Sequence, residues 1–125
     1  MKRVITIPNA PAPIGPYSQA ILKNDTLYVS GQIPLNPKTG VLQVEDIKQA
    51  TIQVMENIKA LVETASLEMK DVVKCSIFLK SMDDFAEVNE VYASYFQTEP
   101  PARETVAVSK LPLDVPVEIS CIAMR

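Results

Sequence analysis

The sequence predicts an α+β domain of two layers, in which one mixed sheet of about six strands carries two helices on one face. Three observations lead to this prediction. The 125 residues suit a single domain, which we assign to residues 1–125. Only two segments show the three- and four-residue apolar spacing of an amphipathic helix. The remaining apolar runs are short and strand-like, and they give the order β-β-β-α-β-α-β-β.

The N-terminal third of the chain predicts three strands and a stiff loop. Residues 3–7 (RVITI) form a short strand that Pro8 ends. Further prolines up to residue 16 restrict the backbone and remove hydrogen-bond donors, so residues 8–17 should form an extended loop. Residues 18–32 predict a hairpin, because Asn24-Asp25 favours a turn between two apolar runs.

Two amphipathic helices follow. Apolar residues share one face of residues 45–66, and Glu45 and Asp46 stand at the start, where the helix dipole favours negative charge. Residues 83–96 predict a second helix, which Ser81 or Asp83 could cap.

Three more strands complete the sheet. Residues 71–81 predict a central strand, with positions 73, 75, 77 and 79 on one face. Residues 103–109 and 116–124 predict the last two strands, joined by a proline-containing loop at residues 110–115.

The sheet face away from the helices is not uniformly polar. Apolar and polar side chains alternate on it: Tyr28, Phe78, Ile122 and Met124 beside Ser30, Ser76, Glu118 and Ser120. An uncovered apolar face usually meets a partner, which favours an oligomer whose sheets pack inward. The alternative is a monomer with scattered apolar surface residues.

Composition excludes several kinds of chemistry. Twelve Lys and Arg against fifteen Asp and Glu give a net charge of −3, which offers no electrostatic footprint for nucleic acid. The chain has no histidine, so Ser-His and Cys-His nucleophile pairs and His-containing zinc sites are excluded. We expect neither a metal nor a cofactor. Cys75 and Cys121 stand in apolar runs, and we expect them to be buried free thiols.

Nothing in the sequence predicts a membrane or secreted protein. No apolar run approaches the ~20 residues of a membrane span. The N-terminal apolar stretch is too short for a secretory signal. We therefore expect a cytoplasmic protein.

Two charged residues are the strongest site candidates. Arg103 follows Pro100-Pro101 at a strand start, where its planar fork could bind a carboxylate; alternatively it is solvated or paired with Glu104. Glu118 lies inside a strongly apolar strand, where partial burial would raise its pKa and make it a general base. Alternatively, Glu118 points to solvent or pairs with a basic residue across the strand.

Three further residues are weaker candidates. Tyr17 closes the proline-rich loop, which either holds it for binding or packs it onto the core. Gly31 follows Ser30 near the end of an apolar strand, where glycine marks a bulge, a close approach to a ligand, or simply the end of the strand. Together the candidates describe a carboxylate clamp, a base and exposed backbone donors.

Five segments in order resemble the RidA family, the reactive intermediate (imine/enamine) deaminases: NAPAPIGPYSQA, VSGQIPLNPKTG, VKCSIFLKSMDDFAEVNEVYASYF, PPARETVAVSKLP and VEISCIAM. The combination of G-P-Y-S-Q, S-G-Q-I-P and P-A-R-x-x-V-x-V-x-x-L-P is specific, and the resemblance covers nearly the whole chain. It implies a chorismate-mutase-like fold and a homotrimer, with sites in the clefts between subunits.

The resemblance also implies an activity, the hydrolysis of 2-iminobutanoate and 2-iminopropanoate to 2-oxo acids and ammonia. Pyridoxal-phosphate-dependent dehydratases release these imines. By resemblance, Arg103 binds the substrate carboxylate and Glu118 positions the attacking water. The rest of the pocket would be Tyr17, Ser30 and the Gly31 backbone. Thr105 stands where many relatives carry cysteine, and its backbone N–H could still face the substrate.

The spacing of the two charged residues bears on the proposed trimer. If the last two strands pair, Arg103 lies nearer the C-terminal end of the final strand than Glu118 does, so the two need not meet in one chain. A site shared between subunits would bring them together. Two other functions stay open: a regulator that binds small carboxylates or 2-oxo acids without turnover, and an RNA-cleaving or translation-inhibiting protein. The acidic balance and absent histidine argue against the latter.

Overall fold

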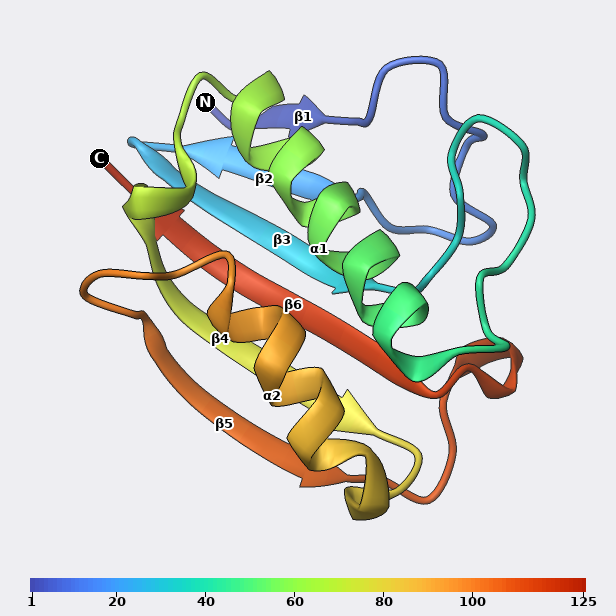
Figure 1. Ribbon diagram of the computed structural model, residues 1–125. Helices are drawn as coiled ribbons and strands as arrows, with labels where there is room; N and C mark the ends of the chain where they lie inside the picture. The colour runs from blue at the N-terminus through green and yellow to red at the C-terminus, as the bar shows by residue number, and fades with distance from the viewer.

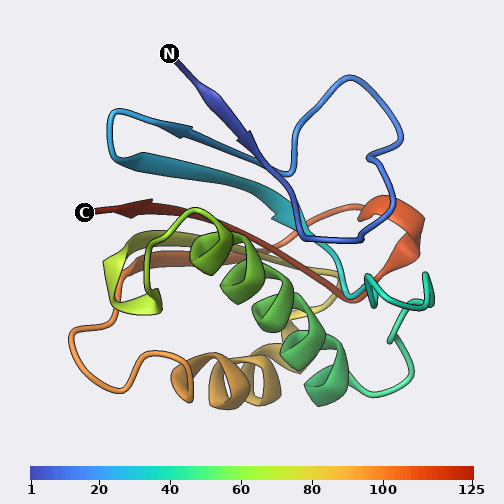
Figure 2. The ribbon, with the colours of Figure 1, turned by 90° about the horizontal axis from the view of Figure 1, so that it is seen from above.

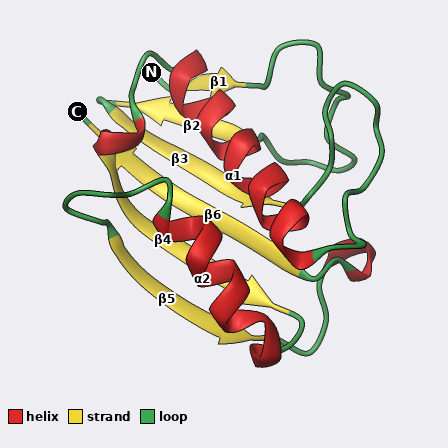
Figure 3. Ribbon diagram, viewed as in Figure 1, coloured by secondary structure: helices red, strands yellow, loops and turns green.

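A computed structural model describes residues 1–125 and contains a six-stranded mixed sheet with two α-helices on one face (Figures 1 and 3). Its element order confirms the predicted β-β-β-α-β-α-β-β arrangement. The strands are β1 (Arg3–Ile5), β2 (Ala20–Lys23), β3 (Thr26–Gln32), β4 (Val72–Leu79), β5 (Ala102–Ala107) and β6 (Val117–Met124). The α-helices are α1 (Ile47–Thr64) and α2 (Phe85–Ala93), and neither has the length and apolarity needed to cross a membrane.

The strand order is β1-β2-β3-β6-β4-β5, with β4 and β5 parallel and every other pair antiparallel. The last two strands therefore do not pair with each other. A connection between parallel neighbours needs a crossover, and α2 supplies it between β4 and β5. β5 consequently lies at an edge of the sheet, and β6 lies between β3 and β4.

The core lies between the sheet and the two helices, which Figure 2 shows together on one side. The apolar face of α1 is buried as its spacing predicts, through residues such as Val54, Ile58 and Leu61. Cys75 and Cys121 lie opposite each other on β4 and β6, and both are buried free thiols, as predicted.

One part of the predicted side-chain alternation is wrong. From Cys75 onward, β4 follows the expected pattern, but the pairing of β4 with β6 shifts between Val72 and Lys74. This irregularity turns Val72 into the core and leaves Val73 44% exposed. A bulge changes which face a residue occupies, and residue types alone did not indicate it here.

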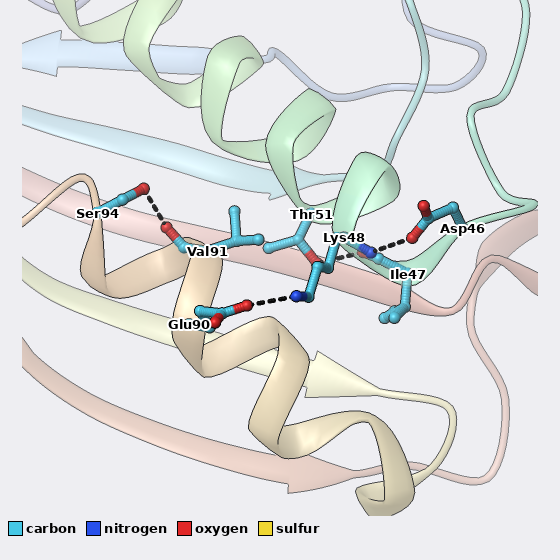
Figure 4. A network of polar contacts seen from close by, with 7 residues as sticks. All are labelled: Asp46, Ile47, Lys48, Thr51, Glu90, Val91 and Ser94. Carbon is cyan, nitrogen blue, oxygen red and sulfur yellow. Dashed lines mark hydrogen bonds and ion pairs between the residues drawn. The ribbon is translucent and has the colours of Figure 1, made fainter.

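Polar contacts fix the start of α1 and connect this helix to α2 (Figure 4). Asp46 caps α1 by accepting a hydrogen bond from the backbone N–H of Lys48 at 2.9 Å. Lys48 Nζ lies 2.5 Å from Glu90 Oε2 on α2. Ser81, one of the two predicted caps, accepts from the Asp83 N–H and caps the short 3₁₀ turn that leads into α2.

The opposite face of the sheet is uncovered, and its composition matches the prediction. The register pairs Tyr28 with Ile122 and Phe78 with Glu118 on this face. Tyr28 is 52% exposed and Met124 is 47% exposed. Val4 and Val106, at opposite edges of the sheet, are also exposed.

Candidate functional site

The candidate residues form two groups on opposite faces of the sheet. Glu118 lies on the uncovered face near the bulge of β3, whereas Arg103 lies on the helix face of the edge strand β5. The first group is Ser30, Gly31 and Glu118, with Tyr17 near Gly31 on the loop before β2, and the second is Arg103 and Thr105. Nowhere do three or more His, Cys, Asp or Glu side chains gather in a way that could hold a metal ion.

Gly31 makes room for the Glu118 side chain. The pairing of β3 with β6 shifts between Val29 and Gln32, so Ser30 and Gly31 together oppose a single residue of β6. A Cβ built on Gly31 would overlap the carboxylate of Glu118. The glycine thus marks a bulge, as one interpretation of its position predicted, and a carboxylate of the same chain approaches it closely.

Glu118 is a half-buried carboxylate without a partner. Burial raises the pKa of its carboxyl above the ordinary value, and no neighbouring charge or hydrogen bond opposes that shift. The expected alternative, a pair with a basic residue across the strand, is therefore wrong. A carboxylate with a raised pKa is suited to accept and return protons nearer neutral pH.

Tyr17 and Gly31 line a small cavity of about 100 Å³. Tyr17 is 56% exposed, so it does not serve chiefly to pack the loop onto the core. The Ser30 hydroxyl donates to the Gln19 carbonyl at 2.9 Å, which fastens the start of the bulge to the segment before β2. The Ser30 side chain therefore stabilises the backbone around Gln19, which forms part of the cavity wall.

Asn57 also lines this cavity, although it was not among the residues predicted from the sequence. Its side-chain amide donates to the carbonyls of Ile33 at 3.2 Å and Leu35 at 2.9 Å, and the residue is buried. These bonds hold the loop after β3 against α1. The available signal was a polar amide on the apolar face of the predicted helix, three residues after Val54 and four before Leu61.

Arg103 is a cation without a carboxylate partner. Its Nη1 donates to Asn89 Oδ1 at 2.6 Å, and none of the ion pairs in the structure includes it. The expected alternative, a pair with Glu104, is wrong. Glu104 lies on the other face of β5, where it binds Lys74 Nζ at 3.0 Å and the Ser76 hydroxyl.

Aromatic rings from α2 surround the Arg103 guanidinium. Its Cζ lies 5.1 Å from the ring centre of Tyr92 and 5.7 Å from that of Phe85. With Asn89, these residues occupy one face of the helix at spacings of four and three. The sequence indicated this face as core and gave no sign that β5 would bring an arginine to it.

The edge position of β5 leaves backbone donors free. The Val108 N–H donates to the Leu79 carbonyl at 2.9 Å, so even-numbered residues of this segment direct their backbone groups toward β4. The alternation of the strand then directs the Thr105 N–H to the free edge. Beside this edge opens a cavity of about 430 Å³, lined by Asn89, Tyr92, Ala93, Phe96, Pro100, Pro101 and Arg103.

The two groups do not converge within one chain. Arg103 pairs with Cys75, which pairs with Cys121, three residues from Glu118 along β6. Two strand spacings and three residues separate the Arg103 and Glu118 backbones by about 14 Å, with side chains on opposite faces. A small ligand of six or seven heavy atoms is too short to contact both charged groups of one chain.

Comparison with known proteins identifies the family. The model of the family described as "Endoribonuclease L-PSP" matches residues 7–125. A RutC family protein of Pyrococcus horikoshii is 54% identical over 100% of this chain and 99% of its own length. A 2-iminobutanoate/2-iminopropanoate deaminase of Salmonella typhimurium is 44% identical over 100% of this chain and 99% of its own length.

A solved structure of the Rid protein family, YyfA from Yersinia pestis, superposes with a TM-score of 0.95 at 48% identity, covering 100% of both chains. Its fold and the family match agree with the five segments identified in the sequence. The chain therefore belongs to the Endoribonuclease L-PSP family, the RidA family that its motifs resemble.

Proposed function

We propose that the protein is a 2-iminobutanoate/2-iminopropanoate deaminase that hydrolyses these imines to 2-oxo acids and ammonia. The observation that carries the proposal is Arg103, an exposed cation with no carboxylate partner beside a cavity at the edge of the sheet. A 2-imino acid presents a carboxylate next to the reactive carbon, and a guanidinium fork matches a carboxylate through two hydrogen bonds. The 44% identical Salmonella deaminase supports the same assignment.

The reaction needs positioning and proton transfer rather than a strong nucleophile. Arg103 would hold the substrate carboxylate, with the Thr105 and Gly31 N–H groups assisting. The substrate enters as an iminium ion, which is already electrophilic at C2. Glu118 would bind a water and take its proton as the oxygen attacks C2. The carbinolamine then collapses to the 2-oxo acid, and Glu118 or water returns the proton to the departing ammonia.

We further propose that the site is shared between subunits of a cytoplasmic homotrimer. The distance between Arg103 and Glu118 within one chain supports a site in which the two come from different subunits. The exposed apolar residues on the uncovered sheet face supply a surface that a second copy could bury.

The description of the matching family model raises RNA cleavage as a second candidate function. The net charge of −3 and the absence of histidine weigh against it. A regulator that binds a small carboxylate without turnover would use Arg103 equally well, but it would not need Glu118.

The test is to generate 2-iminobutanoate with threonine dehydratase and follow the formation of 2-oxobutanoate. We expect acceleration over the spontaneous rate, lost in Arg103→Ala and retained in Arg3→Ala, an exposed arginine on β1. No acceleration by the wild type, or full acceleration by Arg103→Ala, would contradict the proposal. Binding of 2-oxobutanoate without acceleration would favour the regulator, and cleavage of a single-stranded RNA by the same preparation would favour the nuclease.

A further inference from the structure

We infer that Tyr92 and Phe85 are positioning residues that hold the Arg103 guanidinium where it meets the carboxylate of the ligand. This inference rests on the proposed carboxylate-binding role of Arg103. The two rings lie 5.1 and 5.7 Å from Arg103 Cζ, within the range at which an aromatic face attracts a cation. Asn89, between them on α2, accepts a hydrogen bond from Nη1.

The wall that holds the arginine is rigid although Arg103 itself is exposed. Tyr92 is only 4% exposed, and its ring packs against that of Phe96 with 5.0 Å between centres. Phe85 packs against the core at the start of α2. A long side chain at a sheet edge would otherwise sample many rotamers, and each would move its charge. The rings and the amide together restrict that freedom before a ligand arrives.

Phe85, Asn89 and Tyr92 form a cage around the guanidinium, and its chemistry leaves the positive charge of Arg103 available to bind an anion. An aspartate at position 89 could hold the guanidinium more firmly, but it would neutralise the charge that must attract a carboxylate. A neutral amide and two rings orient the group and leave its other N–H donors unpaired. The cage therefore suits an arginine that binds an anion from outside the chain better than one with a structural role.

The Tyr92 ring, rather than its hydroxyl, serves this purpose. The hydroxyl is buried beside the Cys75 thiol and makes no hydrogen bond of ordinary geometry. Burial, reinforced by Cys75, raises the pKa of the Tyr92 hydroxyl far above its ordinary value, so the ring stays neutral at physiological pH. Tyr92→Phe should thus keep the positioning effect, whereas Tyr92→Leu should lose it.

The experiment compares Tyr92→Leu, Tyr92→Phe and the matched control Tyr95→Leu, which removes a partly buried ring that packs against the core, lies outside the cavity beside Arg103 and is not stacked on the guanidinium. Calorimetry with 2-oxobutanoate measures carboxylate binding without turnover. We expect Tyr92→Leu to weaken binding about tenfold, within the range for a partly desolvated cation over a ring. In the imine assay KM should rise by a similar factor with kcat nearly unchanged, because the lost contact serves ground state and transition state alike. Tyr92→Phe should match the wild type.

Two further measurements separate positioning from a structural role. In an Arg103→Ala background, Tyr92→Leu should have no additional effect on 2-oxobutanoate binding, because the ring acts through the arginine. In the ligand-free protein, the side-chain NMR resonances of Arg103 should be displaced by the ring currents in the wild type, Tyr92→Phe and Tyr95→Leu. They should move toward ordinary values in Tyr92→Leu.

The inference is overturned if Tyr92→Leu weakens binding no more than Tyr95→Leu does, if its effect persists without Arg103, or if the wild-type Arg103 resonances show no displacement. Should Tyr92→Leu fail to fold, Phe85→Leu at the less buried ring carries the same comparison. A wild type that binds 2-oxobutanoate through the held arginine but does not accelerate imine hydrolysis would contradict the deaminase proposal alone. A wild type that neither binds 2-oxobutanoate nor accelerates imine hydrolysis would overturn both.

Discussion

Arg103 and Glu118 differ from the charged residues around them because the chain provides neither with an opposite charge. Nearby, Glu104 is satisfied by Lys74 and Ser76, and burial is the only influence that shifts Glu118. A desolvated carboxylate without a partner lowers the stability of a folded chain. Glu118 therefore lowers the stability of the fold at a position where a proton acceptor is useful. Such a trade-off between stability and activity is common at functional sites.

Replacing Glu118 should change stability and activity in opposite directions. Burial raises the pKa of Glu118 in the folded state, so over the interval between its unfolded and folded pKa values the folded chain binds more protons than the unfolded one. The contribution of this group to stability therefore falls as pH rises through that interval. We expect Glu118→Gln to unfold at a higher temperature than the wild type at pH 7–8, and the difference to disappear at pH values below the unfolded pKa of about 4.3.

Thermal unfolding over a pH series checks this result, with the exposed Glu45→Gln as a matched control. The imine assay should show Glu118→Gln near the spontaneous rate. On acidification, the wild type should lose activity at a higher pH than it would if Glu118 had the pKa of an ordinary glutamate. A less stable Glu118→Gln at pH 7–8 would contradict the argument from burial.

The charged residues of the site could be predicted from the sequence, and their partners could not. Arg103 follows two prolines, and Glu118 lies inside an apolar strand. Both are unusual charged residues for their positions, so the sequence indicated them as site candidates. Phe85 and Tyr92 are ordinary core types on an amphipathic helix. Their contact with Arg103 exists only because β5 returns parallel to β4 beneath α2.

At the scale of elements, the bulge in β3 links a strand irregularity to the placement of a side chain. A methyl group at position 31 would meet the far end of the flexible Glu118 side chain, which can rotate away. Gly40 presents the opposite case, since its φ of +73° disfavours other residues while the space around it is open.

These two glycines give a paired prediction. Gly31→Ala should retain most of its thermal stability but lose most imine hydrolysis, because the carboxylate is displaced. Gly40→Ala should lose about 1 kcal/mol of stability through backbone strain and keep its activity. Thermal unfolding and imine turnover, measured on both variants, test this prediction. Wild-type turnover in Gly31→Ala would show that the observed position of Glu118 is not required.

The existence and type of the elements followed from periodicity, and their pairing did not. The alternation in residues 116–124 predicted β6, but nothing in that run shows that it inserts between β3 and β4. Strand order depends on long-range contacts that local patterns do not encode. The irregularity at Val72 has the same origin, since only the partner strand reveals it.

At the scale of the whole molecule, the separation of Arg103 from Glu118 yields a test of subunit sharing. Each of Arg103→Ala and Glu118→Gln should be inactive alone. Mixing them, unfolding and refolding together should restore roughly a quarter of the wild-type activity, because in a cyclic assembly some sites combine an intact arginine with an intact glutamate from different chains.

Refolding each variant separately and then mixing without exchange is the control, and it should give no recovery. A co-refolded mixture that stays inactive would place both residues of each site in one chain. Light scattering on the same samples measures the oligomeric state directly.

The central position of β6 has a consequence for how the chain folds during synthesis. β6 follows both of its neighbours in sequence, so β3 and β4 leave the ribosome first. The edge of each strand that β6 will pair with stays unpaired until β6 is made. Early hairpins can form locally, but joining β1–β3 to β4–β5 requires this strand. Because β6 also carries Glu118, a nascent chain that stops before residue 117 loses the proposed base and the closure of the sheet together. We therefore expect incomplete chains to be degraded rather than to persist as folded proteins that bind a carboxylate without converting it.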